Sequence, residues 1–235
     1  MHPPLITPAQ IESLYKFCKK HYVPYYDLQT ELVDHLATGI EEKMRQQPGL
    51  SFEQALDAVY KGFGYSGFAK IVAERTAQMQ KRNGKIRRRF FWAYFTWPKV
   101  AFTLFLFTAL YTVLQLLPEA YLLPASAILF VVLQVLNYRL VRRLQQYRKQ
   151  QQEQLLLVDG VSGPFFLLAF WQAYFYIVVF GKKYNWEAAT GWWSPVLLLT
   201  VLFVLAVLSV LSYGAFMRSL YREARNTYPA AFKEA

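Results

Sequence analysis

KRNGKIRRRFFWAYFTW (residues 81–97) is the stretch at which the chain changes character. The 80 residues before it are polar and show helical periodicity, which is typical of a soluble module. The residues after it carry four long apolar stretches separated by basic or aromatic connections. This arrangement predicts a polytopic membrane protein with a soluble module ahead of its spans.

The positive charge of the chain is concentrated in its apolar part. The net charge of the 235 residues is +11, yet residues 1–80 carry eight Lys or Arg against nine Asp or Glu. The nine residues from Lys81 to Arg89 supply six positive charges. Basic clusters beside an apolar span are typical of a cytoplasmic membrane face, so we expect no nucleic-acid partner. The single cysteine, Cys18, excludes an internal disulfide.

Four apolar segments approach the ~20 residues that a helix needs to cross the hydrocarbon layer. They are residues 100–117, 120–138, 164–181 and 195–216, and none contains Asp, Glu, Lys, Arg or His. The third is the weakest, because Gln172, Tyr174 and Tyr176 interrupt it. The sequence therefore predicts an all-α fold. It comprises a small cytoplasmic helical bundle (1–80), an interfacial linker (81–99), a four-helix transmembrane bundle (100–217) and a cytoplasmic tail (218–235).

The distribution of Lys and Arg predicts the orientation of these spans. Residues 81–99, 139–163 and 214–235 together carry sixteen of them, whereas the two loops on the opposite side carry two. Because cytoplasmic loops are enriched in Lys and Arg, both termini are predicted to be cytoplasmic. We expect a multi-pass protein of a bacterial inner membrane.

The linker is predicted to lie at the lipid headgroups. Its cationic and aromatic residues suit a helix that enters the membrane boundary. The interface residues are predicted to be Lys85, Arg87, Arg88, Arg89, Trp92 and Trp97, with Trp192 and Trp193 in an aromatic belt between the third and fourth spans. We expect the bilayer and its anionic headgroups as partners. A stop-transfer flank without specific lipid recognition is the alternative.

Four short amphipathic helices are predicted in residues 1–80. Thr7 and Ser51 are N-caps of capping boxes completed by Gln10 and Gln54. Between them a helix starts near Asp27, with an apolar face formed by Leu28, Leu32, Val33, Leu36, Ile40 and Met44. A bundle of this size is marginally stable alone. We therefore expect it to dock on the membrane part or on a second copy, as a homo-oligomer.

A series of short motifs runs through residues 25–75. In order they are Glu31-Leu32-Val33-Asp34-His35-Leu36, Glu41-Glu42, Ser51-Phe52-Glu53-Gln54-Ala55-Leu56, Phe63-Gly64 and Phe68-Ala69-Lys70. Their order and content resemble the HAAS-type helical module, a family in which a short cytoplasmic bundle precedes several membrane spans. The resemblance implies a regulatory or signalling role, often linked with PadR-like transcription regulators, and it implies no catalysis.

The best candidate cluster of polar side chains is Glu31, Asp34 and His35. Glu31 and His35 are four residues apart and share one helical face beside the apolar stripe. We interpret His35 as a boundary histidine paired with a neighbouring carboxylate. A pH-sensitive switch or a partner-facing site is the functional alternative. A metal site needs further converging ligands and is disfavoured.

The sequence contains no motif that would carry an enzyme activity. It has no Walker loop, dinucleotide fingerprint, His-Glu-x-x-His pair or serine elbow. We expect no cofactor and a regulatory or scaffolding role in which the cytoplasmic module binds a protein partner. A small transporter or transport accessory subunit is the alternative, and a lipid-modifying membrane enzyme is a weaker one. Asn83 and Gly84 are poor helix formers and are predicted to interrupt the fourth helix and form a hinge between the two parts, with a passive linker as the alternative.

Overall fold

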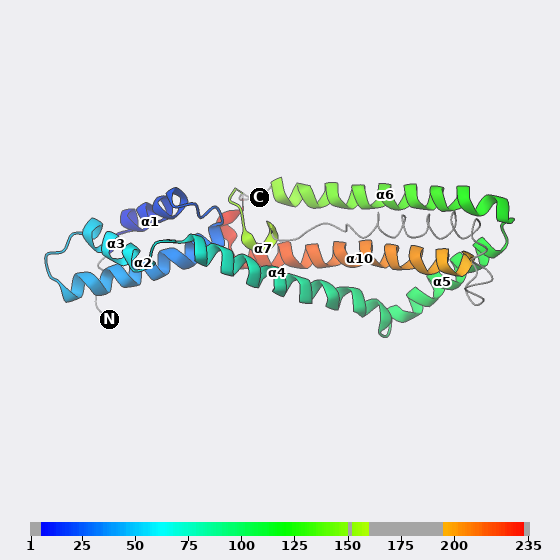
Figure 1. Ribbon diagram of the computed structural model, residues 1–235, viewed down its shortest axis with the longest axis horizontal. Helices are drawn as coiled ribbons and strands as arrows, with labels where there is room; N and C mark the ends of the chain where they lie inside the picture. The colour runs from blue at the N-terminus through cyan, green and yellow to red at the C-terminus, as the bar shows by residue number, and fades with distance from the viewer. Residues whose placement is uncertain (1–5, 150–151, 160–194, 233–235) are drawn as a thin grey trace. The chain divides into compact units, whose positions relative to one another are not determined.

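The computed structural model describes residues 6–149, 152–159 and 195–232 (Figure 1). Every helical element in these ranges is an α-helix or a short 3-10 helix, and the described residues contain no strand. The predicted all-α class is therefore confirmed. The predicted third span (164–181) and the belt residues Trp192 and Trp193 lie outside the described residues.

The chain divides into two compact units, each assembled from separate stretches of sequence. Unit 1 contains Met1–Asn83, Lys149–Val161 and Leu220–Ala235, and unit 2 contains Gly84–Arg148 and Ser162–Ser219. Sequence analysis assigned only residues 1–80 to the soluble module. Unit 1 adds two segments that sequence analysis assigned to a loop and to the tail.

Three amphipathic helices begin unit 1. α1 (Pro8–Lys20) and α3 (Phe52–Lys61) start at the predicted capping boxes, in which Thr7 and Ser51 accept hydrogen bonds from the Gln10 and Gln54 backbones. α2 (Tyr26–Gln46) lies between them and contacts both. The apolar faces that the periodicity predicts form the core, where Leu36 and other members of the α2 face are buried.

α4 (Ala69–Trp92) is helical through Asn83 and Gly84, so the predicted interruption of this helix is wrong. A glycine costs only about 1 kcal/mol relative to alanine inside a helix. The Asn83 side chain is buried, and its Nδ2 donates a hydrogen bond to the Leu157 carbonyl oxygen at 3.0 Å. This hydrogen bond stabilises Asn83 in a helical conformation that its intrinsic propensity disfavours. What remains of the hinge prediction is the boundary between the units, which falls between Asn83 and Gly84.

The two later segments of unit 1 contribute buried apolar side chains. Leu155 to Val158 are each at most 5% exposed and include most of the short helix α7 (Leu156–Asp159). The C-terminal segment contributes buried Leu220, Ala224 and Ala231, the last in a 3-10 helix (Pro229–Ala231). In the sequence this apolar run lies within the basic segment 139–163 between two predicted spans, and it was not predicted to belong to the soluble module.

Unit 2 contains most of the apolar helical residues. α6 (Glu119–Lys149) and α10 (Pro195–Thr227) are long and apolar enough to cross a membrane, with candidate spans at Pro124–Leu144 and Val196–Thr227. They correspond to the predicted spans 120–138 and 195–216. α6 extends beyond the predicted second span, through the basic residues that follow Tyr138, and ends at Lys149.

The first predicted span, residues 100–117, differs from the prediction. α5 (Lys99–Gln115) qualifies as a span only together with Ala69–Phe95, against which it is bent by 68°. A 3-10 turn (Ala93–Phe95) and Pro98 lie at the bend. Because a proline disfavours helical conformation in the residue before it, α4 does not continue straight into α5. The described residues thus contain two candidate spans, or three with the bent pair, where four were predicted for the whole chain.

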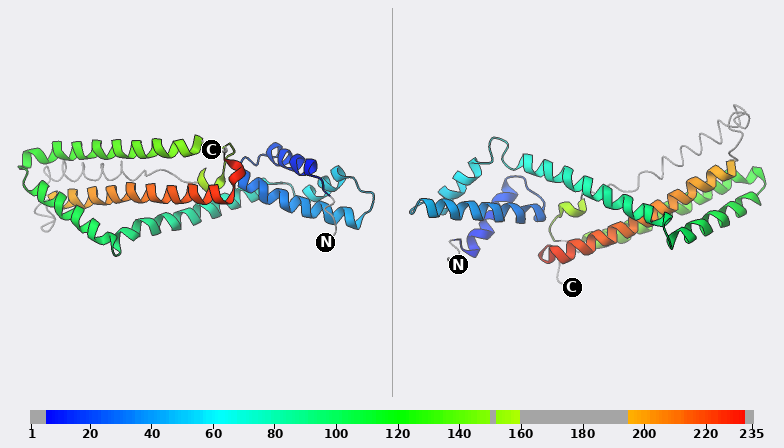
Figure 2. Two further views of the ribbon diagram at one scale, coloured as in Figure 1. Left: turned by 180° about the vertical axis from the view of Figure 1, so that it is seen from behind. Right: turned by 90° about the horizontal axis from the view of Figure 1, so that it is seen from below.

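Apolar contacts join α10 to α5 and α6 within unit 2, and these helices lie side by side in both orientations (Figure 2). Leu114 of α5 packs with Val196 and Leu199. Farther along α10, a Cβ at Gly214 would lie 3.0 Å from a methyl group of Leu140 in α6. Small residues of this kind allow close approach of membrane helices.

Candidate functional site

The first turn of α2 buries a carboxylate. Asp27 is only 8% exposed, and its Oδ1 accepts a hydrogen bond from the Leu28 backbone N–H at 3.0 Å. The N-terminus of a helix favours a negative charge, because the first backbone N–H groups lack partners and the helix dipole is positive there. Local structure alone therefore accounts for an acidic residue at this position, but not for its burial.

The same carboxylate caps α7, which is far away in the sequence. Asp27 Oδ1 accepts a hydrogen bond from the Leu156 N–H, and Oδ2 accepts one from the Leu157 N–H, each at 3.0 Å. The residue before α7 is Leu155, whose side chain cannot cap a helix. Asp27 thus supplies the cap that α7 lacks in its own sequence.

We call residues 152–159 the strap, because this segment is tied to unit 1 at several points. The Tyr26 N–H donates to the Gln154 carbonyl oxygen at 2.7 Å, next to the Asp27 contacts. Lys19 Nζ and Glu153 Oε1 form an ion pair at 2.6 Å. The remaining ties are the Asn83 bond to Leu157 and a bond from the Gln152 N–H to the Ala231 carbonyl oxygen at 2.9 Å. The strap therefore contacts α1, α2, α4 and the C-terminal segment.

A pocket of about 320 Å³ opens beside Asp27, entirely within unit 1. Its volume lies at the lower end of the range typical of small-molecule sites. Its walls come from α2, α4, the strap and the C-terminal segment. The lining residues are Asp27, Leu28, Glu31, Arg75, Gln78, Met79, Arg82, Leu156 and Tyr228.

Two ion pairs border the pocket. Glu31 of α2 pairs with Arg75 of α4, and Arg82 of α4 pairs with Glu223 of α10. All four side chains are 38–46% exposed, so each pair contributes at most about 1 kcal/mol to stability. Through these pairs, two guanidinium groups and the Glu31 carboxylate line the same pocket as the buried Asp27, and Glu223 lies beside Arg82.

Tyr228 stands at the C-terminal wall of the pocket. Burial raises the pKa of its hydroxyl, and the negative charges of Asp27, Glu31 and Glu223 raise it further. Tyr228 is therefore neutral at physiological pH and can both donate and accept a hydrogen bond.

The three residues of the predicted cluster lie within about one turn of α2 but differ in their surroundings. Glu31 lines the pocket and pairs with Arg75, whereas Asp34 and His35 are exposed on α2. The predicted pairing of His35 with a neighbouring carboxylate is not among the contacts of the described residues. The buried Asp27 was missed as a functional residue. The available signal was an acidic first turn together with four consecutive apolar residues, 155–158, in a polar loop.

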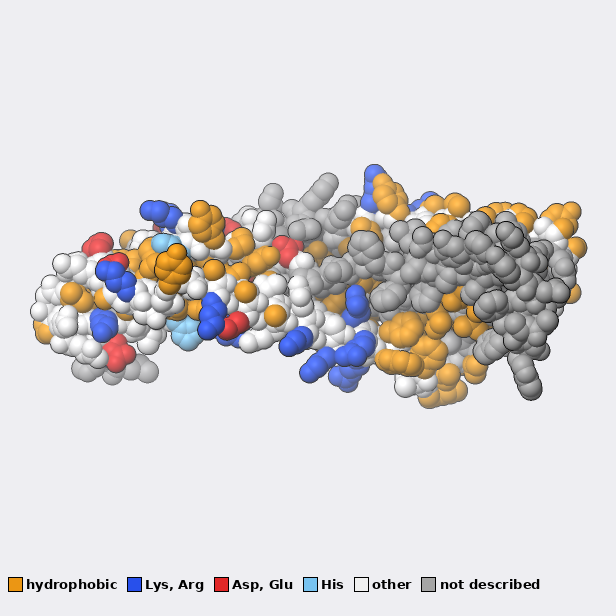
Figure 3. All heavy atoms as spheres, in the orientation of Figure 1, with side chains coloured by type: hydrophobic (Ala, Val, Ile, Leu, Met, Phe, Trp, Pro, Cys, Tyr) orange, Lys and Arg blue, Asp and Glu red, His pale blue; other side chains and the backbone are white. Residues whose placement is uncertain are grey.

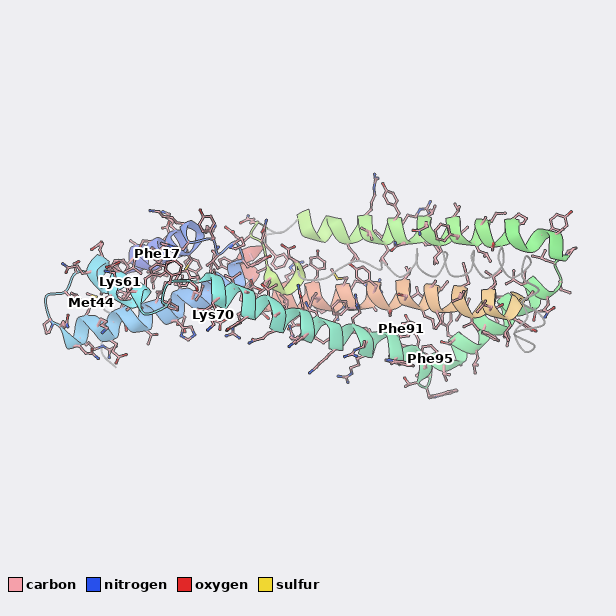
Figure 4. All side chains as sticks on the ribbon, viewed as in Figure 1. Phe17, Met44, Lys61, Lys70, Phe91 and Phe95 are labelled. Carbon is pink, nitrogen blue, oxygen red and sulfur yellow. The ribbon has the colours of Figure 1, made fainter. Side chains whose placement is uncertain are left out.

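The predicted interface residues lie on unit 2. Trp92 and Trp97 are 61% and 81% exposed, and Lys85, Arg88 and Arg89 are exposed while Arg87 is half-buried. Lys and Arg side chains gather beside a hydrophobic surface (Figure 3). Phe91 and Phe95 lie near the bend after α4 (Figure 4), and both rings contact that of Trp92. This pattern suits a membrane boundary.

The described ranges contain neither a cluster of metal-ligating side chains nor a reactive thiol. Within residues 6–149, 152–159 and 195–232, no three His, Cys, Asp or Glu side chains are close enough to hold a metal ion. Cys18 is fully buried, and desolvation raises the pKa of its thiol to about 12. A thiol with so high a pKa is a poor nucleophile at neutral pH.

Comparison with known proteins identifies no relative: no family model, no curated protein and no solved structure matches the chain. The resemblance to HAAS-type modules therefore rests on the residues quoted above.

Proposed function

We propose that the chain is a non-enzymatic, multi-pass protein of a bacterial inner membrane, with both termini in the cytoplasm. In this proposal it acts as a regulatory or scaffolding protein, and unit 1 binds a cytoplasmic protein partner. The positive-inside bias supports the orientation, and the resemblance to HAAS-type modules supports the regulatory role.

The observation that carries this proposal is the composition of unit 1. Its three segments are continuous in the chain with α4, α6 and α10, the helices that contain or adjoin the candidate spans. A free-standing soluble domain would need only one such connection. The chain passes between the two units four times, at 83/84, 148/149, 161/162 and 219/220, which suits a module whose conformation is tied to that of the candidate spans.

The exposed face of α2 offers a surface for the partner. Asp34 and His35 are exposed there, one helical turn from the ion pair of Glu31. Neither side chain is needed for the core of unit 1, so a partner can contact both without unfolding the unit. The exposed Lys, Arg and Trp residues between Lys85 and Trp97 would hold the adjoining helix at anionic headgroups.

Site-specific photo-crosslinking in membranes tests the partner surface. A photoreactive amino acid at position 34 or 35 of the full chain should yield a defined adduct with another protein. The matched controls are positions 13 and 16 on the exposed face of α1. Equal adducts at all four positions, or none at 34 and 35, would contradict a partner on α2. Failure there, combined with solute uptake that depends on the chain, would favour the transport alternative.

A further inference from the structure

We propose that the pocket of unit 1 binds a small organic cation, an amine with an apolar body, and that binding requires the docked strap. This inference is independent of the protein partner proposed above. It rests on the composition of the pocket walls, on their charge and on the chain segments that form them.

The pocket offers apolar and polar walls to one ligand. Leu28, Met79 and Leu156 supply apolar surface, while Glu31 and Tyr228 supply polar atoms. A volume of about 320 Å³ lies at the lower end of the range of ligand pockets and therefore favours a small ligand. The mixed lining favours an amphipathic ligand over a purely polar ion.

The charges at the pocket favour a cation over an anion. Both guanidinium groups are already paired, Arg75 with Glu31 and Arg82 with Glu223. Asp27 adds a third carboxylate, whose hydrogen bonds come from neutral backbone N–H groups and leave its charge in place. The four charged side chains that line the pocket have a formal charge of zero, and Glu223, which pairs with Arg82 beside the pocket, brings the sum to −1. An anion would have to compete with a carboxylate for an arginine.

An ammonium group has acceptors at hand in this arrangement. Glu31 bonds to Arg75 through Oε1, and its other oxygen can accept a hydrogen bond from the ligand. The Tyr228 hydroxyl is neutral and can accept another. Its aromatic side chain also favours a cation, because the ring face is electronegative. Burial is the larger cause of the raised pKa of Tyr228, and the neighbouring carboxylates add to it; these negative charges also attract a cation.

Ligand binding is coupled to docking of the strap. Leu156 belongs to the strap and Tyr228 to the C-terminal segment, so the complete pocket exists only when both segments are in place. A ligand that binds only the docked state stabilises that state by mass action. The cation would therefore strengthen the attachment of the strap to α2.

Hydrogen exchange in the full chain, held in lipid nanodiscs, tests this proposal. The probe is 2-phenylethylammonium, with 3-phenylpropionate and 2-phenylethanol as anionic and neutral counterparts of similar size. At ten times its dissociation constant, the cation should slow exchange of the Leu156 and Leu157 amides about tenfold. The anion and the alcohol should have little effect. Equal slowing by all three, or stronger slowing by the anion, would overturn the proposal.

Two variants and a control separate binding from folding. Glu31→Gln should abolish the effect of the cation, whereas Glu41→Gln, which alters an ion pair with Arg45 elsewhere on α2, should preserve it. Met79→Phe keeps every charge and should block the effect by filling the pocket. If Glu31→Gln loosens α4, Met79→Phe still decides the question. Undiminished protection in the Met79→Phe variant would place the cation elsewhere.

Discussion

Replacing Asp27 should release the strap while leaving the helical core of unit 1 folded. In the Asp27→Ala variant, the buried Leu156 and Leu157 N–H groups lose their acceptor. A buried unsatisfied donor costs about 1–3 kcal/mol, and loss of a helix cap costs about 0.5–2 kcal/mol. Two donors lose their acceptor, but the two estimates describe the same hydrogen bonds and are not added together. We therefore expect the free energy of docking the strap to become less favourable by about 2–4 kcal/mol.

The more informative variant is Asp27→Asn, which keeps the shape of the side chain. It retains one acceptor oxygen but turns the other position into a donor that faces a backbone N–H. We expect it to weaken docking by about 1–3 kcal/mol, as for one unsatisfied group. Both variants should also remove the negative charge that neighbours Tyr228, so the pKa of Tyr228 should fall.

Hydrogen exchange of residues 152–159 in the full chain measures this directly. Each 1.4 kcal/mol corresponds to a tenfold change, so exchange of the Leu156 and Leu157 amides should accelerate about fivefold to 150-fold in Asp27→Asn and more in Asp27→Ala. Asp57→Ala, which removes an exposed carboxylate paired with Lys61 on α3, is the control and should leave these amides unchanged. A change of less than twofold in Asp27→Asn would refute the capping role.

Four further predictions concern the core, the thiol, α4 and the topology. Leu36→Ala, at a fully buried site, should lower the unfolding free energy of unit 1 by about 2–5 kcal/mol in denaturant titrations. Cys18 should resist alkylation at pH 8. Its raised pKa contributes stability that is complete below about pH 9 and is lost towards pH 12, so circular dichroism should show unit 1 weakening across that range. Gly84→Ala should stabilise α4 by about 0.5–1 kcal/mol in thermal melts, because an added Cβ meets no atom within 4 Å; destabilisation would favour a hinge. Reporter fusions after Arg148 should be cytoplasmic and one near Asn185 external; a cytoplasmic Asn185 would contradict four spans.

Local signals in the sequence predict the helices of unit 1 well, because their causes are local. The capping boxes at Thr7 and Ser51 involve residues three positions apart, and the apolar stripe of α2 repeats within each turn. The strap could not be found in this way. Four apolar residues are too few to define a period, and their capping partner Asp27 lies 129 residues before Leu156.

The candidate site shows the same division between local and distant causes. Sequence analysis selected Glu31 because it shares a helical face with His35, but its actual counter-charge, Arg75, comes 44 residues later on another helix. Asn83 illustrates the reverse error. Its low helix propensity is a local property, and a tertiary hydrogen bond to Leu157 outweighs it. Pairings between distant segments therefore decide the site, and a single sequence does not display them.

The covalent connections of unit 1 determine what a movement of the membrane helices would do to it. Residues 150 and 151 connect the end of α6 to the strap in the sequence, and the C-terminal segment contains the end of α10. A displacement of α6 larger than the reach of these two residues, about 7 Å, would carry unit 1 along or pull the strap away from Asp27. The exposed Lys19–Glu153 pair resists little, at most about 1 kcal/mol. The buried hydrogen bonds of Asp27 and the apolar contacts of Leu155 to Val158 supply most of the resistance. Asp27 is thus the residue at which the attachment of the strap can be strengthened or released.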